Sequence, residues 1–203
     1  IKVTQKIGHA IELANEAISD GYYRIICAGG DGTLNETLNG IMLSLQNHPE
    51  INRDSIRLGV IPAGTGNDFV KTVHAPLKIR DLKKSIVEDK HLLVDAGFLE
   101  YHNHRDEVEK RWFINVVDVG LGGVVAERIS HSSRRLSPFL TYQKAIVQTL
   151  LSYRKLPIFV QGDSFTYEGN TMLCVIANAK YFGSGIGIAP DADPTNGTFS
   201  VVI

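Results

Sequence analysis

The sequence predicts an α/β segment followed by a mainly antiparallel β segment. Up to about residue 90, short apolar runs alternate with stretches of helical periodicity, a pattern typical of a parallel sheet with covering helices. From residue 92 onward, strand-like runs follow one another across turn residues, which indicates antiparallel pairing. With 203 residues and 43% hydrophobic composition, the chain has room for one large or two small domains. We expect one domain over 1–92 and a second over 93–203.

The first half predicts helices and strands in alternation. Apolar residues at helical spacing indicate three helices, and continuous apolar runs indicate two strands between them. The helices are expected at 5–19, 33–47 and 79–88, and the strands at 23–28 and 57–61.

The second half contains one long helix among strands. Pro138 is suited to the first turn of a helix over 138–153, whose apolar residues share a face. The strands are expected at 92–99, 111–119, 157–162, 172–178 and 199–203.

The first strand runs directly into Gly29-Gly30-Asp31-Gly32-Thr33. Glycines leave backbone N–H groups uncovered, and the helix that begins near Thr33 directs the positive end of its dipole to the same point. Such a junction is suited to holding phosphate. Because a carboxylate there would repel phosphate, Asp31 suggests a Mg²⁺ ion carried with a nucleotide. The alternative is a turn that carries Gly and Asp for its own geometry alone.

A second loop repeats this chemistry. The strand over 57–61 is followed by Pro62-Ala63-Gly64-Thr65-Gly66-Asn67-Asp68-Phe69, again with glycines, a hydroxyl and an acid. Loops that follow successive strands of a parallel sheet converge on one crevice. We therefore expect the two loops to face one ligand.

The segments GGDGTLNE (29–36) and PAGTGNDF (62–69) resemble the catalytic domain of diacylglycerol kinases and bacterial lipid kinases, which are relatives of sphingosine and ceramide kinases and, more distantly, of NAD kinases. The resemblance continues in order at LVDAG (93–97), NVVDVGLG (115–122) and several short motifs within 177–192. It implies a Rossmann-like, NAD-kinase-like three-layer α/β domain followed by a β-sandwich domain. Family members are longer at both ends, so we expect a fragment that lacks the family's first strand and its C-terminal part.

The same resemblance implies that both loops hold the phosphates of ATP. It also implies a nucleotide contact from Thr4, for which a simple helix N-cap is the alternative. The residues expected at the nucleotide are Thr4, Gly29, Gly30, Asp31, Gly32, Thr33, Leu34, Asn35, Glu36, Gly64, Thr65, Gly66 and Asn67.

Acidic residues at positions that match the family imply Mg²⁺. Asp31, Asp68 and Asp95 are expected around the catalytic ion through water, with a buried acid satisfied by N–H groups as the alternative for Asp95. The turn over 191–198 resembles a structural metal turn, but relatives have Asp-Gly where this chain has Asn-Gly, which is also a plain turn signal. The ligands expected there are Asp193, Asn196 and Thr198.

These features predict an ATP-dependent, Mg²⁺-requiring lipid kinase that phosphorylates the hydroxyl of diacylglycerol or a similar lipid. Asp31 is the catalytic residue that we expect within the chain. In bacterial relatives the general base lies C-terminal to this region and no residue here matches it, so we expect the base outside this chain and the fragment alone to be inactive. The alternatives are an NAD kinase, which shares the first loop but not the second, and a nucleotide-binding regulatory module without catalysis.

Charge and composition limit the partners. A net charge of −1 and a pI near 6.7 leave no domain-wide basic face, so no nucleic acid is expected. A lipid substrate implies work at a membrane surface. Peripheral contact through Arg134, Arg135, Lys144, Arg154 and Lys155 is one interpretation of the basic residues, and a solvated face is the alternative that we favour.

The expected location is the cytoplasm. No apolar run reaches the length needed to span a bilayer, and the two cysteines, Cys27 and Cys174, lie in apolar runs. A peripheral position at the inner membrane face and a homodimer formed through an edge strand are left open.

Overall fold

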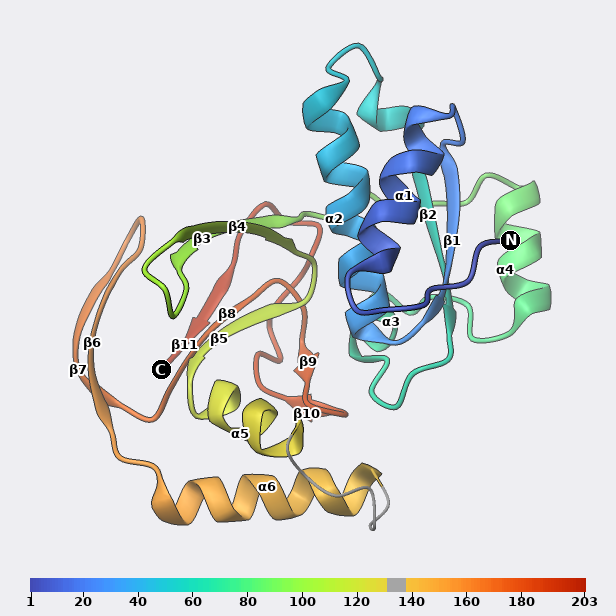
Figure 1. Cartoon of the computed structure of the whole chain (residues 1–203). Coiled ribbons are helices and arrows are strands. Elements are labelled where there is room, and N and C mark those ends of the chain that lie inside the picture. Colours follow the sequence, from blue (N-terminus) through green and yellow to red (C-terminus); the bar gives the residue numbers. More distant parts are fainter. Residues whose placement is uncertain (131–137) are drawn as a thin grey trace. The chain divides into compact units, whose positions relative to one another are not determined.

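The computed structural model describes residues 1–130 and 138–203 (Figure 1). The predicted basic pair Arg134 and Arg135 lies outside the described residues. The chain divides into two compact units. The first unit comprises 1–115 and 178–199, and the second comprises 116–177 and 200–203.

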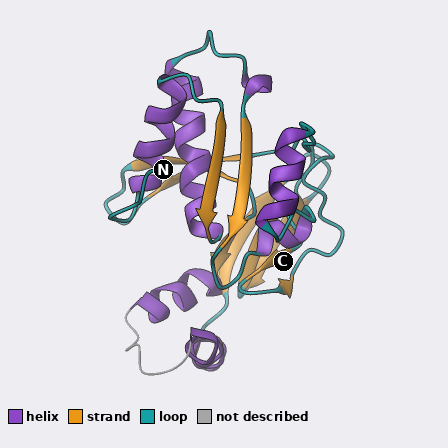
Figure 2. Cartoon of the chain, turned by 90° about the vertical axis from the view of Figure 1, so that its right-hand side faces the viewer, coloured by secondary structure: helices purple, strands orange, loops and turns teal. Residues whose placement is uncertain are grey.

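A parallel pair of strands forms the centre of the first unit. β1 (Arg24–Gly29) pairs in parallel with β2 (Arg57–Pro62), and Gly29 lies opposite Pro62. Helices α1 (His9–Ser19) and α2 (Asp31–Asn47) cover one face of the pair, and α4 (Ile79–Val87) covers the other (Figure 2). A short 3₁₀ helix, η1 (Arg53–Ser55), precedes β2, and α3 (Asp68–Thr72) follows it. The predicted three-layer α/β arrangement is confirmed.

Alternation along the two strands explains the layers. Cys27 and Leu58 belong to the side that packs against α2. Gly59 lies on the opposite side, where a Cβ would be 3.5 Å from the side chain of Leu82 on α4. Successive residues of a strand point to opposite faces, so these short strands serve both helical layers.

Helices α1 and α2 cross closely at one glycine. A Cβ placed on Gly40 of α2 would overlap the carbonyl oxygen of Ile11 and would lie 2.7 Å from Cβ of Ala14. The fully buried Ile18 fills the space beside this crossing together with Ile41. The helix backbones therefore approach each other where no side chain intervenes.

A hairpin is attached to α2 by one amide side chain. β3 (Gly97–His102) and β4 (Val108–Phe113) pair in antiparallel register. Asn39 of α2 donates from Nδ2 to the carbonyl oxygen of Trp112 at 2.9 Å, and its Oδ1 accepts from the N–H of Trp112 at 2.9 Å. These two bonds satisfy the N–H and the carbonyl oxygen of Trp112, which the β3–β4 pairing alone leaves without partners. The short strands β9 (Tyr181–Phe182) and β10 (Ile186–Gly187) complete the first unit.

The second unit is mainly antiparallel. Its three-stranded sheet has the order β11 (Ser200–Val202), β8 (Leu173–Ala177), β5 (Val116–Gly120), and the central strand contains the fully buried Val175. β6 (Leu156–Gln161) and β7 (Thr166–Thr171) form a hairpin. Helices α5 (Leu121–Ser130) and α6 (Pro138–Ser152) pack against each other.

Several predicted elements begin or end elsewhere in the structure. The first helix starts at His9, because Gly8 has a φ of 83°, in the left-handed region that ends or precedes a helix. Residues 91–96 form no strand, so the run expected at 92–99 begins only at Gly97. The run expected at 111–119 is broken near Asn115, whose carbonyl oxygen accepts from the N–H groups of residues 178 and 179. Helices α3 and α5 and strand β7 were not predicted.

The compact units do not follow the predicted boundary. Packing places the hairpin β3–β4 and residues 178–199 with the first unit. The predicted domain boundary between residues 92 and 93 therefore stays a prediction.

We expect Gly40→Ala to destabilise the protein by about 1–3 kcal/mol, because the added methyl group must push α1 away from α2. Urea unfolding followed by circular dichroism measures the change. Gly123→Ala in α5 is the matched control, because a Cβ there meets no atom within 4 Å. An equal loss of stability in both variants would contradict the close crossing.

Candidate functional site

The junction of β1 and α2 presents backbone donors. α2 begins at Asp31, two residues earlier than predicted, with Gly30 as its N-cap in extended conformation. The N–H of Leu34 donates to the carbonyl oxygen of Gly30 at 3.0 Å, which closes the first turn. The N–H groups that precede this bond have no partner inside the helix, and they share the positive end of its dipole. The exposed Gly32 lies among them.

The second loop touches the first. The N–H of Ala63 donates to the carbonyl oxygen of Gly29 at 3.0 Å, which extends the β1–β2 pairing into both loops. A Cβ on Gly30 would lie 3.0 Å from Cα of Gly64, and a Cβ on Gly64 would overlap Cα of Gly30. The two loops therefore meet backbone to backbone, and the expectation that they converge is confirmed.

Asn67 holds the second loop in shape. It has a φ of 50°, in the left-handed region that asparagine tolerates better than most residues. Its Oδ1 accepts from the N–H of Gly64 at 3.1 Å, and its Nδ2 donates to the carbonyl oxygen of Gly64 at 2.8 Å. The exposed Thr65 lies within the turn that these bonds close. Both the oxygen and the nitrogen of the Asn67 amide are thus hydrogen-bonded to the backbone of the loop itself.

Two carboxylates flank the second loop. Oδ1 of Asp31 accepts from the N–H of Phe69 at 3.1 Å, so the first loop binds the start of α3. A Cβ on Gly66 would lie 3.0 Å from Oδ2 of Asp31 and 3.3 Å from Oδ2 of Asp68. The structure therefore brings Asp31 and Asp68 to the same glycine, where an added Cβ would be in tight contact with both carboxylates.

Asp68 already has partners for both oxygens. Its side chain is buried, at 3% residue exposure. Oδ1 forms an ion pair with Nζ of Lys71 at 2.9 Å, and Oδ2 accepts from the N–H of Ser184 at 2.9 Å. A cation at this carboxylate would compete with Lys71 or be held through water.

Some residues predicted at the nucleotide have structural partners. Leu34 is 1% exposed in the apolar core, and its N–H is used in the first turn of α2, so the structure gives it a packing role. Glu36 accepts from the N–H groups of Gly8 and Ala10 at 3.0 and 3.3 Å, which caps α1. The carbonyl oxygen of Asn35 accepts from Asn39.

Thr4 and Thr33 occupy different surroundings. Thr4 is exposed in the segment before α1, and Gly8 rather than Thr4 is the N-cap of that helix. Thr33 lies against Gly29, where a Cβ would be 2.7 Å from its Oγ1. The Thr33 hydroxyl therefore lies at the end of β1, beside the first loop.

Asp95 lies at the second acidic turn. Its N–H donates to the carbonyl oxygen of Pro194 at 2.6 Å, and its Oδ2 accepts from the N–H of Gly197 at 2.7 Å. Nδ2 of the fully buried Asn178 donates to the carbonyl oxygens of Asp95 and Ile114 at 2.8 and 2.7 Å. The contacts that the structure gives for the Asp95 carboxylate are thus with this turn rather than with the glycine loops.

The turn itself is closed by side chains. Oδ1 of Asp193 accepts from the N–H and hydroxyl of Thr195 at 2.9 and 2.7 Å, and these bonds lower the pKa of that carboxyl below its usual value of 3.8. Oδ1 of Asn196 accepts from the N–H and hydroxyl of Thr198 in the same way. Within the described parts of the chain, no three His, Cys, Asp or Glu side chains gather closely enough to hold a metal ion. The metal ligand sets stay predictions.

Sequence reasoning missed three contributors to the site. Lys71, Ser184 and Asn178 were not assigned roles, although Ser184 and Asn178 lie within the segment 177–192 that resembles the family. The signal for Lys71 is its spacing three residues after Asp68, a distance at which charged side chains meet on a helix. Ser184 acts through its backbone N–H, so its residue type carries no signal.

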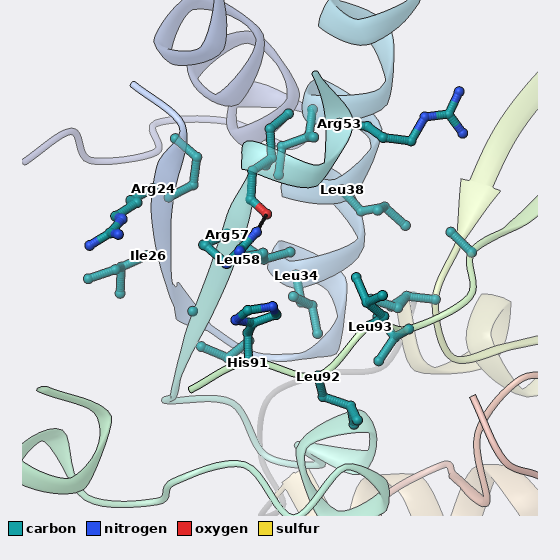
Figure 3. A pocket seen from close by; sticks show the side chains of 18 of the residues that line it. Arg24, Ile26, Leu34, Leu38, Arg53, Arg57, Leu58, His91, Leu92 and Leu93 are labelled. Carbon is teal, nitrogen blue, oxygen red and sulfur yellow. Dashed lines mark hydrogen bonds between the residues drawn. The ribbon is translucent and has the colours of Figure 1, made fainter. Parts of the chain in front are cut away.

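A cavity of about 1080 Å³ lies elsewhere in the first unit. It runs along β2 toward α2, α4 and residues 89–94, and the glycines of the two loops do not line it. Figure 3 shows Leu34, Leu58 and Leu93 among its mainly apolar side chains. Arg57 lines it too, and its guanidinium lies 3.6 Å from Asp89. Because none of the glycines of the two loops lines it, the cavity is distinct from the loop site.

Two family models match the chain. The diacylglycerol kinase catalytic domain matches residues 1–99, and the YegS C-terminal NAD kinase beta sandwich-like domain matches residues 115–203. Together they run in the order of the predicted domains.

Named relatives agree with these matches. A diacylglycerol kinase of Staphylococcus carnosus is 30% identical over 204 residues, covering 98% of this chain and 60% of the relative. A diacylglycerol kinase of Staphylococcus aureus is 32% identical over 201 residues, covering 98% and 58%. The chain thus spans about 60% of the length of these curated relatives.

Solved structures share the fold. The crystal structure of a diacylglycerol kinase from Bacillus anthracis aligns with a TM-score of 0.64 at 23% identity, covering 98% of this chain and 60% of that one. A second structure from the same organism, of a candidate diacylglycerol kinase, gives a TM-score of 0.69 at 24% identity, covering 98% and 61%.

We expect Gly64→Ala to force the two loops apart, because its methyl group would overlap Gly30 Cα. Stability should fall by about 1–3 kcal/mol, and amide hydrogen exchange at Phe69 should accelerate as its bond to Asp31 is lost. Gly59→Ala, in the strand β2 that leads into this loop, is the control, since its Cβ would meet only ordinary contacts at 3.5 Å and beyond. Unchanged exchange at Phe69 in Gly64→Ala would refute the close approach.

We expect Thr195→Val to raise the pKa of Asp193 toward 3.8, because the hydroxyl that stabilises its charged form is removed. A carboxylate whose folded pKa is lowered stabilises the fold above its unfolded pKa, and this contribution is lost as the pH falls through the folded value. Titration of the Asp193 carboxyl carbon by NMR between pH 2 and pH 6 measures the shift, with Thr166→Val on β7 as the control. An Asp193 titration unaltered by Thr195→Val would count against this turn geometry.

Proposed function

We propose, from the premise that this chain belongs to the diacylglycerol kinase catalytic domain family, that it carries the nucleotide-binding part of an ATP-dependent lipid kinase. The reaction moves the γ-phosphoryl group of ATP to the hydroxyl of diacylglycerol or a similar lipid. The observation that carries the proposal is the backbone contact between Gly30 and Gly64, which puts two phosphate-binding loops against each other. The family match supports the choice of reaction.

Backbone groups of the two loops supply the phosphate contacts in this proposal. The N–H groups of Gly32 and Thr33 lie in the first turn of α2, where the helix dipole favours negative charge. Thr65 lies exposed in the facing loop, braced by Asn67. Phosphoryl transfer needs mainly positioning and charge stabilisation, which such donors provide.

Asp31 and Asp68 are proposed to hold Mg²⁺ through water. Both carboxylates approach Gly66, and hard oxygen donors suit this ion. Because Asp68 is engaged by Lys71 and Ser184, its role is to orient water rather than to bind the ion directly. When bound, Mg²⁺ would offset the negative charge of the phosphate oxygens. The turn with Asp193, Asn196 and Thr198 is proposed as a separate cation site, and Asp95 is proposed to belong to it because its carboxylate accepts from the N–H of Gly197.

The lipid partner and the location follow from the same proposal. In the described residues, no helix combines the length and the apolar character required to traverse a bilayer. We propose that the protein meets its lipid at the surface of the cytoplasmic membrane. No residue of this chain is assigned as the base that accepts the lipid proton, and a homodimer stays a prediction.

The proposed function is tested by phosphoryl transfer from labelled ATP to diacylglycerol with the intact protein. We expect Asp31→Asn to lower kcat by at least about 100-fold. The variant would hold Mg²⁺ less well, and the stabilisation of negative charge at the transferring phosphoryl group would be lost. Thr65→Ala should weaken ATP binding, measured separately by calorimetry. Asp20→Asn, at an exposed position after α1, is the control and should leave both quantities unchanged.

The acceptor panel separates the alternatives. Phosphorylation of NAD without phosphorylation of any lipid would replace the proposal by an NAD kinase. Nucleotide binding without turnover on any acceptor would replace it by a regulatory module. Full activity of Asp31→Asn would remove the first loop from the mechanism.

A further inference from the structure

The cavity along β2 has mainly apolar walls. They include Leu38 of α2, Val60 of β2 and Ile86 of α4, and the volume of about 1080 Å³ is at the upper limit for small-molecule pockets. Leu92 and Leu93, in the segment after α4, also line the cavity (Figure 3). These two leucines are 55% and 73% exposed, so part of the apolar lining is left in contact with solvent.

Charged side chains of the lining gather where the two strands begin. Arg24 of β1 and Arg57 of β2 lie opposite each other in the parallel register, and both guanidinium groups approach the carboxylate of Asp89. The distances to Asp89 are 3.5 and 3.6 Å, whereas a charge-assisted hydrogen bond is typically about 2.7–2.9 Å long. Asp89 therefore leaves hydrogen-bonding capacity on both guanidinium groups.

Arg57 carries a donor without a partner. Its Nη1 donates to the carbonyl oxygens of Asp54 and Ile56 at 2.6 and 3.2 Å, which holds the guanidinium beside the cavity. Its Nε is buried and has no hydrogen-bond partner among the described residues. An unpaired buried donor costs free energy, so a ligand that brings an acceptor to Arg57 is favoured. A carboxylate matches two neighbouring N–H groups of a guanidinium with its two oxygens.

The net charge of the lining fits a ligand with a single negative charge. Four lining side chains are Arg or Lys and two are Asp, and Lys90 is also paired at 2.7 Å with Glu88, which lies outside the lining. With histidine neutral, one positive charge is left without a counterpart. A head with two negative charges, such as a phosphate monoester, would add an uncompensated charge beside Asp89.

We propose that this cavity binds a long-chain fatty acid as its anion. The carboxylate is held by Arg24 and Arg57, and the acyl chain lies along β2 among the apolar side chains. The ligand is thus defined by two features of the cavity, a long apolar wall and one excess positive charge at its end. The inference goes beyond phosphoryl transfer and does not depend on it.

The cavity shares two residues with the surroundings of the glycine loops. The side chains of Leu34 and Phe69 line it, while their N–H groups donate to the carbonyl oxygen of Gly30 and to Oδ1 of Asp31. An acyl chain that packs against both side chains restricts the first turn of α2 and the start of α3. Slower exchange of these two amide hydrogens therefore reports on a filled cavity.

The test is isothermal titration calorimetry of the intact protein with dodecanoate, below its micelle concentration and without nucleotide. We expect saturable one-to-one binding whose affinity falls about fourfold for each CH₂ removed, down to octanoate. Dodecanol has the same chain without the charge and should bind at least about tenfold more weakly. Saturation with dodecanoate should slow amide exchange at Leu34 and Phe69 and leave Val175 in the second unit unchanged.

Two pairs of variants locate the site. Arg57→Gln should weaken dodecanoate binding at least about tenfold, because the carboxylate loses a charged partner, and Arg105→Gln at an exposed position is its control. Ser85→Phe keeps the test decisive if Arg57→Gln folds poorly. Ser85 lines the cavity from α4, so the added ring should fill it and abolish binding, whereas Lys83→Phe on the exposed part of the same helix should not.

Absence of dodecanoate binding to the intact protein overturns the proposal, because the cavity is then filled by protein. Equal affinity for dodecanol and dodecanoate overturns it as well, and so does unchanged binding in both Arg57→Gln and Ser85→Phe. Binding of phosphatidate at this site without binding of dodecanoate would replace the proposed ligand class. None of these titrations requires lipid phosphorylation, so their failure is distinguishable from failure of the proposed function.

Discussion

The candidate site depends on one steric constraint, the approach of two backbones without side chains at Gly30 and Gly64. The parallel register of β1 and β2, with Gly29 opposite Pro62, brings both strand ends to the same level. The bond from Ala63 to Gly29 continues that register into the loops. From there the side chains follow: Asp31 reaches the start of α3, Asn67 closes the second loop, and Asp68 is placed beside Gly66. A larger residue at Gly30 or Gly64 would push the two loops apart and so disturb all of these contacts.

The sequence alone predicts the parts of this arrangement that depend on local chemistry. Strand β1, the first glycine loop and α2 are readable because apolar runs, glycines and helical periodicity act within a few residues. Convergence of the loops follows from the rule for parallel sheets. The roles of Leu34 and Glu36 are not readable in this way, since a motif does not say that Leu34 faces the core or that Glu36 caps a helix that precedes it.

Long-range contacts account for most of the structural features that could not be predicted from the sequence. Asp95 resembles a loop acid in sequence, but its carboxylate bonds to Gly197, 102 residues away. The strand expected at 92–99 begins only at Gly97, and the N–H of Asp95 donates to the carbonyl oxygen of Pro194 instead of to a neighbouring strand. Lys71 and the backbone of Ser184 reach Asp68 from two different parts of the chain. Such partners are chosen by tertiary packing, which local propensity does not encode.

The bond from Ser184 to Asp68 has a consequence for biosynthesis. The two residues are 116 positions apart, so the buried carboxylate stays without its backbone donor while the intervening chain is still being made. At typical elongation rates of about 5–20 residues per second, that interval lasts roughly 6–23 s. The glycine loops and α3 leave the ribosome long before the segment that completes them. Assembly of this region is thus a late event on the nascent chain, and a chaperone that shields α3 during translation would act in that interval.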